Sequence, residues 1–262
     1  MKASDATRSG AFPFLTHTTE DGTMTKKPDE ISIDPVSPEY VVAVARAVLA
    51  VDHQDIRTTP VGRTVIGWVL AAHDQILAVG EMTRDGRKSA TGPNTRTVME
   101  ISLRLMWLLS LDDRAAGLRA QFDVEANYAN QHPENLQAMG LPVTIIETTP
   151  EIDLEQFGPL DTALKGVARA VLNFSKQTKD AGGFYDMWWK ATQFSHATAA
   201  LADAYAPVSA FGVFTTPDEP IDWSGHLNAI SMVICAVAGQ ILMEEGLSPD
   251  TARIFFNVSA SA

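Results

Sequence analysis

A stripe of charged side chains crosses an otherwise apolar stretch at residues 95–119. Arg96, Glu100 and Arg104 are spaced four residues apart, and Trp107 follows them. On a helix that turns about 100° per residue, these side chains, together with Ser110 and Arg114 further along, fall within a sector about 120° wide. Either the stripe faces water, with Glu100 pairing with both arginines, or it forms a buried Arg–Glu–Arg cluster that lines a cleft with Trp107 as its wall. A paired buried cluster of this kind is a candidate binding or catalytic site.

A second polar face is predicted on a helix further along the chain. If that stretch is one continuous helix, Tyr185, Trp189, His196 and Asp203 lie on the same side of it. His196 among aromatic side chains is either a structural histidine or a general acid or base, because imidazole titrates near neutral pH. We therefore take Tyr185 and Trp189 as candidate binding residues and His196 as a candidate for catalysis.

Signatures of metal and cofactor sites are missing from the sequence. There is no His-Glu-x-x-His pair, no phosphate-binding glycine loop, no dinucleotide fingerprint and no Gly-x-Ser-x-Gly turn. The single cysteine, Cys235, excludes an internal disulfide and a cysteine-based zinc site, and it lies in an apolar run typical of a core residue. We predict neither a metal nor a cofactor.

Helical periodicity predicts the elements that must position these residues. Ser37, Thr59 and Ser248 each precede a proline and are typical helix starts, because a capping side chain is followed by a residue that fits the first turn. Gly117 marks a predicted kink, and residues 141–149 favour a short extended segment. Helices are predicted at 37–51, 61–82, 95–119 with a continuation through residue 130, 154–178, 184–205, 222–245 and 248–256. The fold class is therefore all-α, a multi-helix bundle of about six to seven helices.

Composition separates the amino-terminal residues from the rest of the chain. Residues 1–36 are rich in Thr, Ser, Asp, Gly and Lys, which predicts a disordered or loosely attached arm. Residues 37–262 are long enough to bury a sizeable core and are predicted to form a single helical-bundle domain.

The net charge restricts the classes of partner. The 262 residues carry a formal charge of -12 and a sequence pI of about 4.8. This acidity argues against general binding of nucleic acid or anionic membranes, although it is compatible with a local basic patch. No signal peptide is recognised, and residues 229–243 are too short and too mixed for a membrane span. We expect a cytoplasmic protein without membrane contact. The sequence does not identify a partner, and a second copy of the chain, forming a homodimer, is one alternative.

Two stretches together resemble an uncharacterised family of helical bacterial proteins. Its pattern is matched by Arg96, Glu100, Trp107, Asp112 and Arg114, and downstream by Tyr185, Trp188, Ser195 and His196. That family is similar to the broad class of HEPN-like helical bundles, and the resemblance implies a helical bundle of a class that includes ribonucleases and defence-associated proteins. Catalytic members carry an arginine four to six residues before the histidine. This chain departs from that pattern, because Lys190 is the only cation at that spacing.

Three hypotheses for function follow. The first is a binding or regulatory protein with a polar cleft between the two predicted helices, in a context of stress response or phage defence. The second is a metal-independent ribonuclease in which His196 is the general acid or base, Arg96 and Arg104 hold phosphate, and Glu100 orients them. The third is an interaction module that dimerises without catalysis. The first two predict that these four side chains converge.

Overall fold

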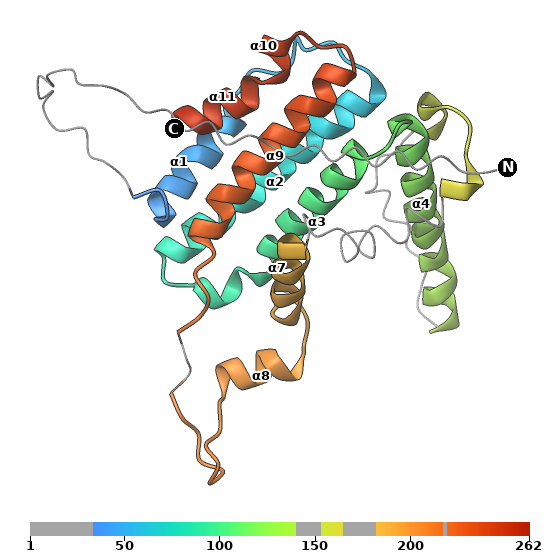
Figure 1. Cartoon of the computed structure of the whole chain (residues 1–262). Coiled ribbons are helices and arrows are strands. Elements are labelled where there is room, and N and C mark those ends of the chain that lie inside the picture. The colour runs from blue at the N-terminus through green and yellow to red at the C-terminus, as the bar shows by residue number, and fades with distance from the viewer. Residues whose placement is uncertain (1–33, 140–152, 165–181, 217–218) are drawn as a thin grey trace, which may run out of the picture. The chain divides into compact units, whose positions relative to one another are not determined.

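The computed structural model describes residues 34–139, 153–164, 182–216 and 219–262. Every named element in these ranges is a helix, and the one extended pairing within them is an isolated antiparallel bridge between Val208 and Phe214. The predicted all-α bundle is confirmed for this part of the chain (Figure 1). The described residues belong to one compact unit. The predicted arm lies outside the described residues except for its last three, and so does the predicted extended segment at 141–149.

The first two helices begin where their capping residues predicted. In α1 (Pro38–Leu49) the Ser37 side chain accepts a hydrogen bond from the backbone amide of Tyr40. In α2 (Pro60–Arg84) Thr59 accepts one from the amide of Gly62. Both helices open on proline, whose missing N–H would have no intrahelical partner at that position. The two helices pack against each other and bury one apolar face each.

The helix predicted over residues 95–119 is two helices, α3 (Gly92–Leu109) and α4 (Arg114–Ala138). The chain turns at residues 110–113, where Asp113 Oδ1 accepts a hydrogen bond from the Ala116 amide at 2.9 Å and so caps α4. The predicted kink at Gly117 is therefore wrong, because the break comes earlier and Gly117 lies inside α4. A helical wheel drawn through the break misplaces every residue beyond it.

The core is built around α9 (Ser224–Glu244), which packs against α1, α2 and α3 and against the short helices α10 (Pro249–Ala252) and α11 (Ile254–Ser261) (Figure 1). The predicted start at Ser248 is confirmed, since its hydroxyl accepts a hydrogen bond from the Thr251 amide. Large side chains of α2, α3 and α9 are fully buried together, among them Ile76, Leu105 and Ile234. Burial of this apolar surface is the main stabilising contribution to the bundle.

The helix predicted over residues 184–205 is also two helices, α7 (Gly182–Gln193) and α8 (Ala199–Tyr205). Residues 194–198 form a turn between them, and the Thr198 side chain caps α8 by accepting from the Leu201 amide at 3.1 Å. α7 packs against α3. Of the helix predicted at 154–178, the structure describes the short 3-10 helix Leu154–Phe157 and a few residues after it, and the rest lies outside the described residues.

One helix in the described part of the chain, α9, is long and apolar enough to cross a membrane by length and composition alone. Its most apolar window has a mean hydropathy of 1.7, and half of that window is buried inside this structure. The core helix of a soluble protein has the same properties, so the helix by itself decides nothing about a membrane.

Candidate functional site

The polar stripe of α3 divides between two neighbouring parts of the fold. Arg96, in the first half of the helix, contacts His196 in the turn between α7 and α8. Arg104, two turns further on, contacts Glu100 of its own helix and Glu125 of α4. Two of the four predicted side chains therefore meet at one place and two at another, instead of all four lining one cleft.

Arg96 and His196 meet across 100 residues of sequence. Arg96 Nη1 lies 3.1 Å from His196 Nε2. Since a guanidinium only donates hydrogen bonds, Nε2 must accept, and the imidazole in this contact carries its proton on Nδ1. Arg96 is half-buried and His196 is exposed, so the pair is open to solvent on one side.

The turn that carries His196 is fixed by local hydrogen bonds and by close packing. The Ser195 hydroxyl donates to the Ala191 carbonyl at 2.7 Å, and the Thr198 amide donates to the His196 carbonyl at 2.8 Å. Next to them, Phe194 packs directly on Gly92 at the start of α3, where an added Cβ would lie 2.8 Å from Phe194 Cβ. Glycine at this position lets the turn approach α3 closely enough for the Arg96–His196 contact.

Aromatic side chains of α7 flank the pair. Arg96 Cζ lies 5.9 Å from the centroid of the Trp188 ring, within the range of a cation–π interaction. Tyr185 stacks on Trp188, with ring centroids 5.7 Å apart and an interplanar angle of 29°. Trp189, one of the predicted binding residues, is 51% exposed and has no ring contact among the described residues. Trp188 is therefore the tryptophan beside Arg96, and the helical wheel did not select it.

Arg96 keeps its charge unneutralised in the described part of the chain. No carboxylate of the described residues lies within ion-pair distance of it, and its buried Nε makes no hydrogen bond there. A half-buried guanidinium in this state retains N–H donors and a positive charge for a ligand.

Arg104 is in the opposite situation. Its Nη2 donates to Glu100 at 2.9 Å and its Nη1 to Glu125 at 2.7 Å. Burial opposes the charge of Arg104, but the hydrogen bonds to the two carboxylates outweigh it, so the pKa of the guanidinium is raised. A small cavity of about 270 Å³, walled in part by Trp68 and Gln121, adjoins this cluster. The Arg104–Glu125 pair thus joins α3 to α4, and the two carboxylates neutralise the positive charge that was predicted to hold phosphate.

Trp107 lies in the protein interior and not at the wall of a cleft. Its side chain is 1% exposed and packs on Ala120 of α4 together with Leu111 and Leu160. The reason is the break before α4, which turns that helix back over this face of α3. Arg114 follows this break and therefore does not extend the stripe. It pairs instead with Glu244 of α9.

Asp203, predicted on the same face as His196, is separated from it by the turn at residues 194–198. It lies on α8 with an exposed side chain. The predicted shared face of Tyr185, His196 and Asp203 therefore does not form, since the wheel assumed a continuous helix.

A buried polar cluster around His73 was not anticipated from the sequence. His73 is fully buried, with Nδ1 2.7 Å from the Val69 carbonyl and Nε2 2.8 Å from the Ser231 hydroxyl. Nδ1–H donates to the carbonyl, so the serine hydroxyl donates to Nε2. Burial lowers the pKa of His73 to about 4 and raises the pKa of nearby Cys235 to about 12. With no opening to solvent, we interpret His73 as a neutral structural histidine that links α2 to α9.

The described residues contain no group of three or more His, Cys, Asp or Glu side chains placed to hold a metal ion. No family model matches the chain, and no curated protein or solved structure was found to match it. The HEPN-like resemblance therefore stays a prediction.

Proposed function

We propose that the chain is a ligand-binding protein in which Arg96 and His196 bind an anionic group, with a binding or regulatory role. The observation that carries this proposal is the unneutralised Arg96 guanidinium 3.1 Å from a neutral imidazole. An oxyanion placed against the pair would accept charge-assisted hydrogen bonds from the free N–H groups of Arg96. The exposed edge of His196 leaves room for such an anion to approach from solvent.

The aromatic side chains of α7 favour a particular class of anion. Trp188 and Tyr185 form a stacked pair directly beside Arg96. Planar rings next to a phosphate-binding cation suit a nucleotide or the end of a single-stranded RNA, in which a base stacks while the phosphate meets the arginine. A role in stress response or phage defence belongs to the same proposal and rests on the HEPN-like resemblance alone. A cytoplasmic location is also part of the proposal and is expected from the single cysteine of the sequence.

Calorimetric titration with AMP and with adenosine tests the binding proposal. Arg96→Gln removes the charge that meets the phosphate and should weaken AMP binding by about tenfold or more, as expected for the loss of charge-assisted hydrogen bonds. Arg46→Gln is the matched control, because Arg46 is an exposed arginine on α1 that pairs with Glu81. Adenosine should bind more weakly than AMP to the unmodified chain. Equal affinity of AMP for the Arg96→Gln and Arg46→Gln variants would contradict the proposal.

A second candidate is the metal-independent ribonuclease, and the same contact favours it. An imidazole next to a phosphate-binding guanidinium is placed to transfer a proton at the phosphate while the arginine stabilises its charge. Lys190, the cation at the HEPN-like spacing, pairs with Asp186 at 2.7 Å. Arg96 would take the place of that cation from a different helix.

The ribonuclease activity has its own test. Purified protein is incubated with mixed RNA in the presence of a chelator, alongside the His196→Ala and His226→Ala variants. His226 is an exposed histidine on α9 and serves as the control. The proposal predicts cleavage by the unmodified chain and by His226→Ala, and none by His196→Ala. Absence of cleavage by the unmodified chain removes the nuclease and leaves the binding proposal standing.

A further inference from the structure

A cavity of about 630 Å³ adjoins the turn at residues 194–198, where Phe194 lines it. Its walls come from the residues before and at the start of α3, from the turn after α7 together with α8, and from the residues that precede α9. Its volume lies in the range of pockets that bind small organic molecules, about 300–1,000 Å³. Neither Arg96 nor His196 lines it, so it is distinct from the proposed anion site.

Aromatic and aliphatic side chains form much of the wall. Phe194, Tyr205 and Trp223 each contribute a ring, and Ile221 adds an aliphatic surface. Trp223 is 5% exposed and makes an edge-to-face contact with His226, with centroids 6.0 Å apart, so its ring is held in place. Tyr205 is 58% exposed at the opposite side. Such a wall favours a ligand with an apolar body.

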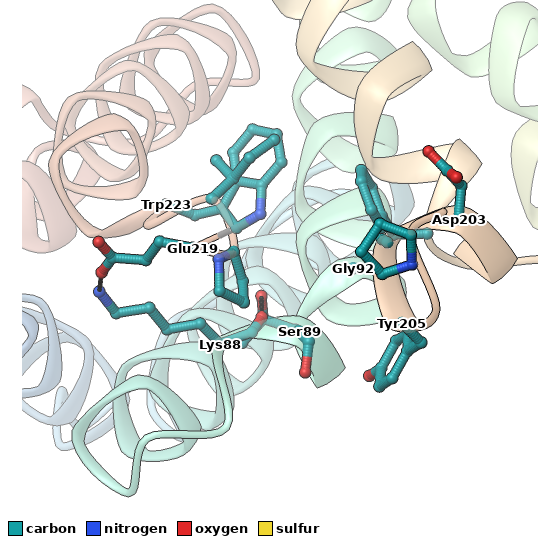
Figure 2. Close-up of a pocket in the computed structure, with 13 residues that line it drawn as sticks. Lys88, Ser89, Gly92, Asp203, Tyr205, Glu219 and Trp223 are labelled. Atoms are coloured by element: carbon teal, nitrogen blue, oxygen red, sulfur yellow. Dashed lines mark hydrogen bonds and ion pairs between the residues drawn. The ribbon is translucent and has the colours of Figure 1, made fainter. Parts of the chain in front are cut away.

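The charge of the pocket is negative. Lys88 is its single cation among the described lining residues, and its Nζ is held by Glu219 at 2.9 Å and by Asp222 at 3.2 Å. Two carboxylates on one ammonium leave no positive charge for an anionic ligand. Asp203 adds a third carboxylate, and no ion pair or hydrogen bond among the described residues neutralises it. Figure 2 shows the Lys88–Glu219 pair on one side of the pocket and Asp203 and Tyr205 on the other.

We propose that this pocket binds an organic ammonium ligand, with the cation at the Asp203–Tyr205 side and the apolar body against Trp223. A carboxylate without a partner attracts the positive charge, and aromatic faces stabilise an ammonium group through their quadrupoles. The same arrangement disfavours carboxylate or phosphate ligands, because Lys88 is already neutralised and the remaining charge repels them. The pocket thus selects a ligand of opposite sign to the one proposed for Arg96 and His196.

NMR titration of the full chain with three probes of similar size tests the inference. The probes are benzyltrimethylammonium, benzyl alcohol and phenylacetate, and the signal followed is the Trp223 indole N–H, assigned with a Trp223→Phe variant. Benzyltrimethylammonium should shift this signal at lower concentration than benzyl alcohol, and phenylacetate should leave it unchanged. Binding of phenylacetate as tight as that of the ammonium probe, or no shift with any probe, would overturn the proposal.

Variants at exposed positions separate the cation site from general effects. Asp203→Asn should weaken the binding of benzyltrimethylammonium about fivefold, the upper range for a partly exposed charge pair. Asp74→Asn removes another exposed carboxylate, on α2 outside the pocket, and should leave the affinity unchanged. Tyr205→Phe keeps the ring and should bind within about twofold of the unmodified chain, whereas Tyr205→Leu loses the aromatic contact and should bind about fivefold more weakly. Equal affinities in all four variants would refute the assigned cation position.

Discussion

Replacing His73 by glutamine should remove a large part of the acid sensitivity of the fold. An ordinary histidine binds a proton near pH 6.5, whereas burial lowers the pKa of His73 to about 4. Between these values the unfolded chain binds a proton that the folded chain does not. His73 therefore leaves the free energy of unfolding unchanged above about pH 6.5 and lowers it as the pH falls from about 6.5 toward 4. At about 1.4 kcal/mol for each pH unit, the loss over the whole window is about 3 kcal/mol.

Urea unfolding followed by circular dichroism measures this effect. Between about pH 7.5 and about pH 5 the unmodified chain should lose roughly 2 kcal/mol more of its free energy of unfolding than His73→Gln does. Glutamine itself destabilises the folded state at every pH, by about 1–3 kcal/mol for imperfectly replaced buried hydrogen bonds, so only the difference between the two pH values is compared. The acidic residues titrate alike in both proteins and cancel in that comparison.

His226→Gln provides the control for the loss of a histidine as such. His226 is exposed on α9, so this variant should keep the pH dependence of the unmodified chain. If His73→Gln also keeps it in full, His73 does not stay neutral in the folded state and the reasoning about the buried cluster is refuted.

Three further predictions follow from the packing. Gly92→Ala should push the Phe194 backbone away from α3 and destabilise the fold by about 1–2 kcal/mol. The same displacement moves the turn that carries His196 and should weaken AMP binding. Gly67→Ala is the control, because the space at its Cβ is open, and it should change neither stability nor AMP binding. Arg104→Met should lower the free energy of unfolding by about 1–2 kcal/mol, because two carboxylates lose their partner, and an unchanged urea midpoint would contradict the bridge between α3 and α4. Cys235, 1% exposed with its pKa raised to about 12 by burial, should resist a thiol reagent at about pH 8 until urea unfolds the chain; fast labelling of the folded protein would show that this side chain is accessible.

Helix starts were predictable because capping is local. Ser37, Thr59 and Ser248 each bond to a backbone amide within the next three residues, so the sequence around them suffices to place the start. The breaks before α4 and α8 carried a similar signal in Asp113 and Thr198. The residues before and after each break have a composition and an apolar spacing typical of a helix, so the sequence pattern did not reveal the two turns.

The candidate site could be predicted only in part, since its partners come from distant segments. The wheel placed Arg96, Glu100 and Arg104 on one face, but which neighbour each of them meets depends on the position of α4 and of the α7–α8 turn. Trp107 shows the same limit, because a residue next to a polar stripe is buried once another helix covers it. His73, four residues after Val69 and three before Ile76, has the spacing of a buried face and could have been found from periodicity.

The contact between Arg96 and His196 is tested most directly by NMR of the His196 imidazole nitrogens with and without AMP. In the free protein the ring should carry its proton on Nδ1, with Nε2 accepting the hydrogen bond from Arg96. AMP should shift both ring nitrogens and its own phosphorus signal. Arg96→Gln should require an AMP concentration about tenfold higher or more for these shifts, whereas Arg46→Gln should show them at the same concentration as the unmodified chain. Ring signals that stay unchanged at saturating AMP, or that shift at the same AMP concentration in Arg96→Gln, would contradict an anion site at this contact.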